Sequence, residues 1–138
     1  MKGNKLYIYT DGGSRGNAGP SGIGVIIQDS KRKKIKEISK YIGEATNNIA
    51  EYNALLHGLE EADEKKASDI VVYMDSELLV RQLSGEYRVK DEAMRPLFEK
   101  ALAILKRFDS FEIKHVAREK NREADKLVNK AINLAGLF

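Results

Sequence analysis

The stretch LYIYTDGGSRGNAGPSG, residues 6–22, decides the fold. Its β-forming start, Leu6–Thr10, predicts a strand, and its glycine-rich remainder, Gly12–Gly22, predicts a loop. Asp11 stands between the two and, by the two-residue period of a strand, shares a face with Tyr9. A carboxylate therefore ends an otherwise apolar row. Because burying an unpaired charge is costly, Asp11 is a candidate functional residue.

Outside this stretch, apolar patterns alternate between strand and helix periods. The basic run Lys31–Lys34 marks a hairpin, which we interpret as a solvated turn. Helices are predicted where apolar residues recur every three to four positions. The order βββαβααβα predicts an α/β fold with a five-stranded mixed sheet and helices on its faces. The further strands are expected at residues 24–28, 35–42, 70–74 and 111–116, and the helices at 48–66, 77–83, 92–107 and 122–134.

Three more carboxylates interrupt or flank apolar patterns. Asp75 follows the strand at 70–74, as Asp11 follows the first strand, so both lie at carboxyl ends of strands. Open α/β sheets bind their ligands at that edge. Glu51 lies on the inward stripe near the start of the first long helix, and Asp125 lies in the first turns of the last helix, where the dipole favours an anion. All four side chains can converge on one point.

Each of these residues also has an ordinary structural explanation. Asp11 suits a turn, Asp75–Ser76 a helix cap, and Asp125 a charge that complements the helix dipole. No capping role explains an inward Glu51. A cluster of all four would repel itself unless a cation neutralised it. Since the chain offers oxygen ligands and no cysteine, Mg²⁺ or Mn²⁺ fits such a cluster.

The composition sets the bounds for these interpretations. With 138 residues, 42% of them hydrophobic, the chain is long enough for a single domain over residues 1–138. It has no cysteine, which excludes disulfides, thiolate zinc sites and a cysteine nucleophile. The net charge of +3 permits an anionic partner without requiring one. We expect a soluble, cytoplasmic monomer without a membrane partner.

Four motifs follow one another along the chain, Tyr9–Pro20, Thr46–Tyr52, Met74–Glu77 and Arg118–Asp125. Together they resemble type 1 ribonuclease H. The resemblance implies a ribonuclease H-like fold and a metal-dependent endoribonuclease that cleaves the RNA strand of RNA/DNA hybrids, giving 5′-phosphate and 3′-hydroxyl products. It implies that Asp11, Glu51, Asp75 and Asp125 are the catalytic residues and the ligands of two Mg²⁺ ions about 4 Å apart, for which Mn²⁺ can substitute.

The resemblance also implies which residues contact the nucleic acid. Glycines let backbone approach it closely, and polar groups near the minor groove distinguish the RNA strand by its 2′-hydroxyls. A plain helix cap is the alternative interpretation of Thr46–Asn48. The implied substrate-binding residues are Gly12, Gly13, Ser14, Arg15, Gly16, Asn17, Thr46, Asn47, Asn48, Glu77 and Arg118.

The chain departs from the family pattern in several places. Many relatives carry a histidine in the loop before the last catalytic aspartate, whereas Ala117–Asn121 has none, and we interpret His115 and His57 as structural. Glu77 replaces an amide that is common in relatives. The segment Gly85–Pro96 is too short for the lysine-rich helix with which some relatives grip hybrids. We therefore expect modest affinity with strong salt dependence.

Two alternatives remain open at this stage. The first is a non-catalytic nucleic-acid binding module of the same fold, although a binder gains nothing from four carboxylates that repel phosphate. The second is a related nuclease that cleaves double-stranded RNA or DNA junctions, because one fold supports several activities.

Overall fold

The computed structural model describes residues 3–136 and confirms the predicted class. Five strands form one mixed sheet in the order β3-β2-β1-β4-β5. The central strand β1 pairs antiparallel with β2 and parallel with β4, and β5 continues the parallel half. The elements are β1 (Lys5–Ser14), β2 (Gly19–Gln28), β3 (Lys34–Ala45), α1 (Asn47–Glu64), β4 (Asp69–Met74), α2 (Glu77–Leu83), α3 (Arg95–Leu105), β5 (Ser110–His115), a 3₁₀ turn (Arg118–Lys120) and α4 (Arg122–Ala135).

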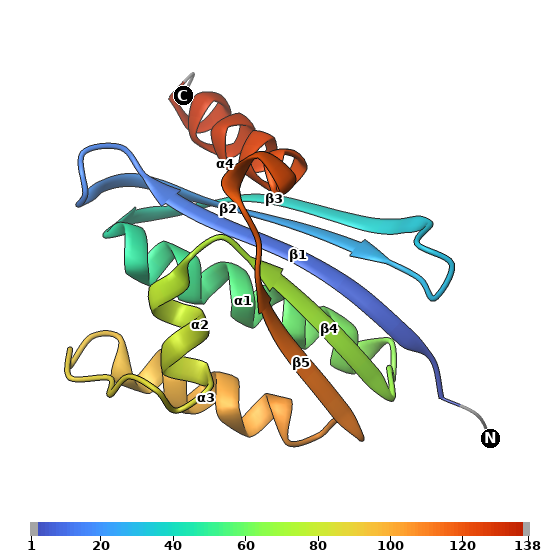
Figure 1. The fold of residues 1–138 in the computed structure, drawn as a ribbon. Helices are drawn as coiled ribbons and strands as arrows, with labels where there is room; N and C mark the ends of the chain where they lie inside the picture. The colour runs from blue at the N-terminus through green and yellow to red at the C-terminus, as the bar shows by residue number, and fades with distance from the viewer. Residues whose placement is uncertain (1–2, 137–138) are drawn as a thin grey trace.

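The sheet lies between two helical layers (Figure 1). Helix α1 packs on β1 and β2, with α2 and α3 beside it, and α4 packs on β2 and β3 from the opposite face. Along β1 the residues alternate as a strand requires. Leu6 and Ile8 are buried in the main core with Leu55 and Leu59 of α1, whereas Tyr7 and Tyr9 face the other side and are half-buried.

The prediction of a loop over Gly12–Gly22 is wrong at both ends. Strand β1 continues to Ser14 and β2 begins at Gly19, which leaves a turn of only four residues. Gly16 lies in this turn with a φ of 96°, whereas glycines within the strands allow close packing. A Cβ on Gly12 would lie 2.2 Å from the carbonyl oxygen of Ala50 in α1, and one on Gly24 would lie 2.1 Å from that of Ala124 in α4. Glycine thus lets both helices approach the sheet at its centre.

Other boundaries differ by smaller amounts. Helix α3 begins at Arg95 instead of Glu92, because the Asp91 carboxylate accepts the N–H groups of Ala93 and Met94 in a turn before the helix. The 3₁₀ turn at residues 118–120 was not predicted. The order of elements was predicted correctly, and α2 has the predicted bounds.

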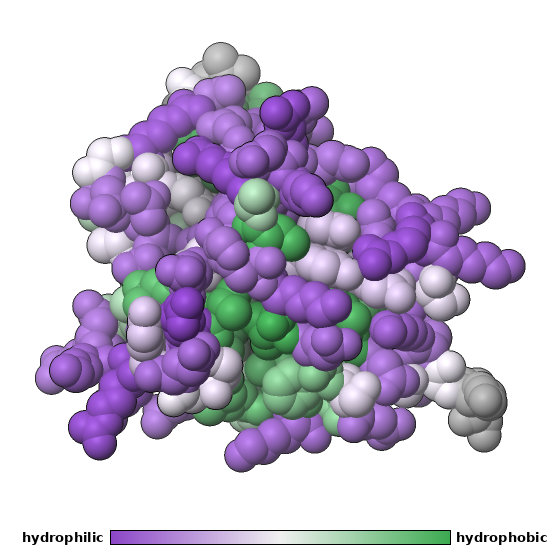
Figure 2. Space-filling model, in the orientation of Figure 1, coloured by the Kyte–Doolittle hydropathy of each residue, from purple (hydrophilic) through white to green (hydrophobic). Residues whose placement is uncertain are grey.

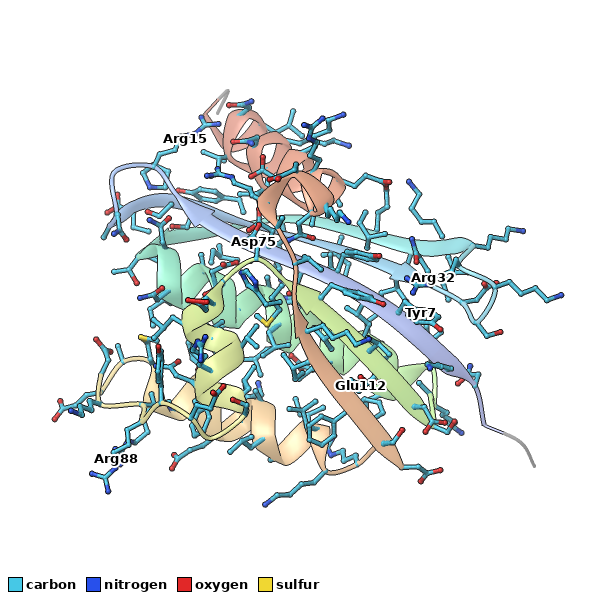
Figure 3. The ribbon with its side chains drawn as sticks, viewed as in Figure 1. Tyr7, Arg15, Arg32, Asp75, Arg88 and Glu112 are labelled. Carbon is cyan, nitrogen blue, oxygen red and sulfur yellow. The ribbon has the colours of Figure 1, made fainter. Side chains whose placement is uncertain are left out.

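The basic hairpin is the exposed turn that its sequence predicts, since Lys31, Arg32 and Lys33 are all exposed. The side chain of Arg32 also contacts the sheet. Its guanidinium lies 3.6 Å from the ring centroid of Tyr7 and donates hydrogen bonds to the hydroxyls of Tyr9 and Tyr73, at 3.3 and 3.0 Å (Figure 3). Arg32 therefore holds the hairpin against the half-buried tyrosines.

The surface is predominantly hydrophilic in the view of Figure 2, above all over α4 and the β2–β3 hairpin. None of the helices within residues 3–136 has the combination of length and apolar character that a membrane crossing requires.

The close approach of α4 makes Gly24 sensitive to a single added carbon. We expect Gly24→Ala to lower the free energy of unfolding by about 1–3 kcal/mol, because the new Cβ displaces the backbone of α4. Urea unfolding followed by circular dichroism measures this change. Gly136→Ala is the matched control, since no atom would lie within 3.4 Å of its Cβ and its φ is −71°. A loss at Gly136 equal to that at Gly24 would contradict the packing argument.

Candidate active site

Three carboxylates from three elements meet at the edge of the sheet. Asp11 lies within β1, Glu51 in the second turn of α1, and Asp75 directly after β4. One oxygen of each lies within 4.8 Å of one oxygen of the others. Asp11 and Glu51 are only 7% and 8% exposed, whereas Asp75 is half-buried. Asp125 of α4 lines the same groove but lies outside this tight group.

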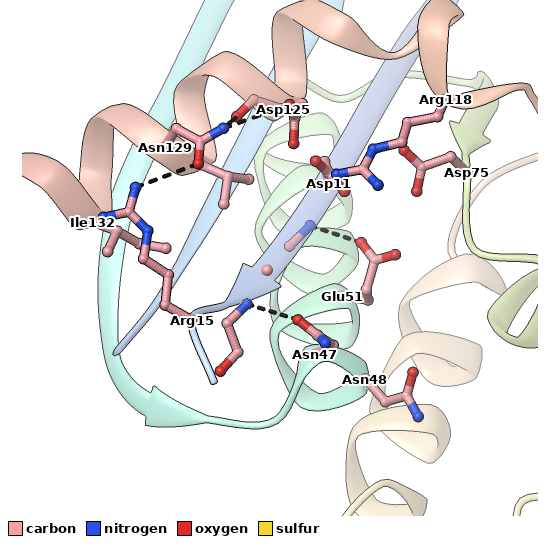
Figure 4. A pocket seen from close by; sticks show the side chains of 14 residues that line it. Asp11, Arg15, Asn47, Asn48, Glu51, Asp75, Arg118, Asp125, Asn129 and Ile132 are labelled. Carbon is pink, nitrogen blue, oxygen red and sulfur yellow. Dashed lines mark hydrogen bonds between the residues drawn. The ribbon is translucent and has the colours of Figure 1, made fainter. Parts of the chain in front are cut away.

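Local structure orients the side chain of Glu51 toward the cluster. The Thr46 hydroxyl accepts the N–H of Ile49 and so begins α1 at the position that turns Glu51 toward the sheet. One carboxylate oxygen of Glu51 then accepts the backbone N–H of Gly12 at 2.7 Å, next to Asp11 (Figure 4). The hydrogen bond fixes Glu51 and joins α1 to β1 at the cluster.

The electrostatics of the cluster are unfavourable without a cation. Burial, followed by the charges of Glu51 and Asp75, raises the pKa of Asp11 from 3.8 to about 10. Burial and the charge of Asp75 raise the pKa of Glu51 from 4.5 to about 8, although the Gly12 N–H and the charge of Arg118 act in the opposite direction. Both carboxyls therefore resist ionisation together.

A divalent cation fits these residues. The donors are all carboxylate oxygens, which Mg²⁺ and Mn²⁺ prefer. Their spacing allows one ion to touch all three groups, and its positive charge would remove the repulsion that raises the pKa values of Asp11 and Glu51. The cluster is thus suited to hold metal.

The cluster opens into a groove of about 500 Å³ between α1 and α4. The β1–β2 turn and the start of α1 form one wall, where Asn47 accepts the N–H of Ser14 at 2.8 Å and donates its own N–H to Asn17. Arg118 stands on the opposite rim and points toward Asp11 and Asp75 in Figure 4. The lining residues are Asp11, Gly12, Gly13, Ser14, Arg15, Asn47, Asn48, Glu51, Asp75, Arg118, Asp125, Val128, Asn129 and Ile132.

Four residues expected to contact substrate do not line the groove. Gly16 and Asn17 form the β1–β2 turn with positive φ angles of 96° and 34°. Thr46 caps α1, as its alternative interpretation proposed. Glu77 lies in the first turn of α2 and pairs with Arg81 at 3.5 Å.

Three lining residues were not predicted from the sequence. Val128, Asn129 and Ile132 follow Asp125 on α4 by three, four and seven positions, the spacing of one helix face. Asn129 accepts a weak hydrogen bond from Arg15 at 3.4 Å and donates to the backbone carbonyl of Asp125 at 3.1 Å. Helical periodicity counted from Asp125 was a signal that could have identified them.

Neither histidine lines the groove. His115 is exposed on β5, and the Nδ1 of His57 lies 2.9 Å from the carbonyl oxygen of Asn53 one turn earlier in α1. The structural interpretation of both histidines stays a prediction.

Comparison with known proteins finds matches over most of the chain. Residues 9–131 match the family model described as reverse transcriptase-like. The bifunctional protein Rv2228c of Mycobacterium tuberculosis is 40% identical over 95% of this chain, although the chain spans only 36% of that protein's length. Ribonuclease H of Trichodesmium erythraeum is 33% identical, over 94% of this chain and 90% of its own.

Solved structures share the fold closely. RNase H1 from Halobacterium salinarum superposes with a TM-score of 0.91 at 38% identity, covering 94% of this chain and 98% of its own. LC11-RNase H1 in complex with an RNA/DNA hybrid gives a TM-score of 0.89 at 46% identity, with the same coverage.

The raised pKa values make stability depend on pH in the absence of metal. Folded Asp11 and Glu51 hold protons that the unfolded chain, with pKa values of 3.8 and 4.5, releases. Their stabilising contribution is therefore complete below about pH 4 and is lost as pH rises toward 8 and 10. We expect the melting temperature in EDTA to fall over this range.

Asp11→Asn should flatten that pH dependence, because it removes the central charge. Thermal unfolding between pH 5 and 9 measures the difference. Glu92→Gln, an exposed carboxylate ahead of α3, serves as the control and should follow the wild type. A wild-type melting temperature that rises from pH 6 to 9 in EDTA would contradict the repulsive cluster.

Proposed function

The chain belongs to the type 1 ribonuclease H family, and from this membership we propose that it hydrolyses the RNA strand of RNA/DNA hybrids. One observation carries the proposal: three carboxylates whose oxygens lie within 4.8 Å of one another at the floor of an open groove. A groove that only bound nucleic acid would repel phosphate with these charges. A groove that holds cations at this position attracts the phosphates of a nucleic acid, and the cations can promote hydrolysis of a phosphodiester bond.

Asp11, Glu51, Asp75 and Asp125 would hold two divalent ions, with Mg²⁺ as the expected metal. Asp11 has the central position, since the charges of the other three all raise its pKa. When bound, the ions would activate the attacking water and stabilise the leaving 3′ oxygen, which gives 5′-phosphate and 3′-hydroxyl ends. The Gly12 N–H keeps Glu51 oriented toward the cluster.

The walls of the groove supply groups suited to the two strands. Asn47 and Asn48 offer amides, and Gly13 offers backbone without a side chain, at the wall near α1. Such groups can contact the 2′-hydroxyls of RNA from the minor groove. Arg118 on the opposite rim supplies a permanent positive charge for a backbone phosphate. LC11-RNase H1, whose fold this chain shares, is described in complex with an RNA/DNA hybrid. The same proposal includes a monomer that acts in the cytoplasm.

A cleavage panel tests the activity directly. Purified protein with Mg²⁺ should cut the labelled RNA strand of a hybrid and leave double-stranded DNA intact. Asp11→Asn should reduce the rate by about 10³-fold or more, as expected when an essential catalytic group is removed. Denaturing gels with 5′-labelled RNA give both the rate and the product ends.

Double-stranded RNA belongs in the same panel, because cleavage of that substrate is the alternative activity. Glu92→Gln should cut the hybrid at the wild-type rate, since this residue lies away from the groove. An intact hybrid after prolonged incubation with wild-type protein and Mg²⁺ would refute the nuclease activity. A non-catalytic nucleic-acid binding module would then be the remaining interpretation. Faster cutting of double-stranded RNA than of the hybrid would reassign the substrate.

Arg118→Ala separates substrate binding from chemistry. Loss of one charge-assisted contact worth about 1.5 kcal/mol should raise KM about tenfold and leave kcat within about twofold. The slope of log KM against log salt concentration should fall by about 1, as for one lost phosphate contact. Steady-state kinetics at several salt concentrations measure both. A fall in kcat at unchanged KM would contradict the phosphate role.

A further inference from the structure

Asn121 is a buried amide at the junction between the 3₁₀ turn and α4. Its side chain is 1% exposed, although it belongs to a loop that is otherwise open to solvent. Its Nδ2 donates a hydrogen bond to the backbone carbonyl of Thr10 at 2.9 Å and a second one to Oδ2 of Asp75 at 3.3 Å. The first of these bonds joins residues 111 positions apart in the chain.

The ordinary explanation for an asparagine in this place is a helix cap. Asn121 does occupy the N-cap position of α4, but its side chain makes no capping hydrogen bond. The amide is turned away from the free N–H groups of the helix and into the protein. Its role therefore depends on Thr10 and Asp75 and not on the start of α4.

The chemistry of the two partners fixes the orientation of the amide. Both are oxygen acceptors, so the nitrogen and not the oxygen of the side chain must face them. An uncharged amide nitrogen carries two hydrogens, one for each acceptor. A lysine or arginine would bring a positive charge to the edge of the cluster, and a serine has only one hydrogen to donate. Asparagine donates a hydrogen bond to each acceptor and adds no positive charge that would compete with a cation.

These bonds connect the elements that carry the carboxylates. Thr10 precedes Asp11 in β1 and forms the last pair of the β1–β4 ladder, so its carbonyl lies where strand pairing ends. The backbone carbonyl of Asn121 accepts the N–H of Asp125 at 3.1 Å, and its own N–H donates to Arg118 at 3.0 Å. One residue thus contacts β1 next to Asp11, Asp75 after β4, and the first turn of α4.

We propose that Asn121 is a positioning residue for the metal cluster, which holds Asp75 in its ligating orientation and sets α4 with Asp125 against the end of β1. A hydrogen bond to one oxygen of Asp75 leaves the second oxygen for a cation. Residues that orient ligands in this way commonly change metal affinity about 10- to 100-fold when replaced. The inference rests on the metal site of the proposed function.

Asn121 does not itself contact the substrate. It is absent from the residues that line the groove and instead borders a separate hollow next to Tyr9 and Gln28. Its loss should therefore lower the affinity for metal and leave the affinity for the nucleic acid unchanged.

Asn121→Ala is the test, with Mn²⁺ as the probe in isothermal titration calorimetry. We expect the dissociation constant for Mn²⁺ to rise about tenfold or more. In cleavage assays the Mg²⁺ concentration for half-maximal rate should rise by a similar factor, while KM for the hybrid at saturating Mg²⁺ stays unchanged. A merely structural role would lower the melting temperature in EDTA without moving either metal constant.

Asn133→Ala is the matched control, because Asn133 is an exposed asparagine on the same helix, and it should retain wild-type metal constants. Wild-type protein that binds no Mn²⁺ would refute the metal site itself. Wild-type and Asn121→Ala proteins that bind Mn²⁺ within about twofold of one another would refute only the role of Asn121.

A milder variant covers the case in which Asn121→Ala fails to fold. Asn121→Ser keeps one donor and fills part of the space, and it should give a folded protein whose Mn²⁺ affinity is still reduced, since one hydroxyl cannot hold Thr10 and Asp75 together. Circular dichroism verifies the fold before titration. A folded Asn121→Ser protein with wild-type affinity for Mn²⁺ would overturn the proposal.

Discussion

Repulsion among Asp11, Glu51 and Asp75 is the constraint on which the rest of the structure depends. Three carboxylates with oxygens within 4.8 Å separate unless rigid elements hold them. Each comes from a different element, so no local rearrangement relieves all the contacts. Burial makes the repulsion stronger, as the raised pKa values of Asp11 and Glu51 indicate. The fold tolerates this cost at one edge of the sheet because its core consists mainly of buried hydrophobic side chains.

Close packing at glycine is what keeps the elements in place. Helix α1 approaches β1 at Gly12, whose backbone N–H then reaches Glu51 directly. Helix α4 approaches β2 at Gly24 on the opposite face and so brings Asp125 over the end of β1. The site is therefore supported from both layers, and its accuracy depends on backbone contacts more than on long side chains. Arg32 contacts Tyr7 and Tyr73 and so holds the β2–β3 hairpin against β1 and β4.

The sequence predicts the positions of the carboxylates better than the contacts around them. Asp11 and Asp75 are identifiable because a two-residue period stops at each, and Glu51 because it falls on the inward face of a helix. Glycine is ambiguous, since the same residue serves a turn or a close approach, and the expected loop over Gly12–Gly22 proved to be largely strand. Asn121 occupies the N-cap position of α4, but its side chain bonds to the distant Thr10 and Asp75 instead. Long-range partners of this kind leave no periodic signal.

The placement of Asn121 and α4 after all five strands of the sheet has a consequence for biosynthesis. A nascent polypeptide that has emerged only as far as β5 already contains Asp11, Glu51 and Asp75, yet it lacks the amide between Thr10 and Asp75 and the helix that covers Gly24. The contacts of Thr10 and Asp75 with Asn121 can form only after residue 121 has been translated and has emerged from the ribosome. A chain that ends before α4 therefore lacks Asp125 and the contacts that this helix makes with β2 and β3.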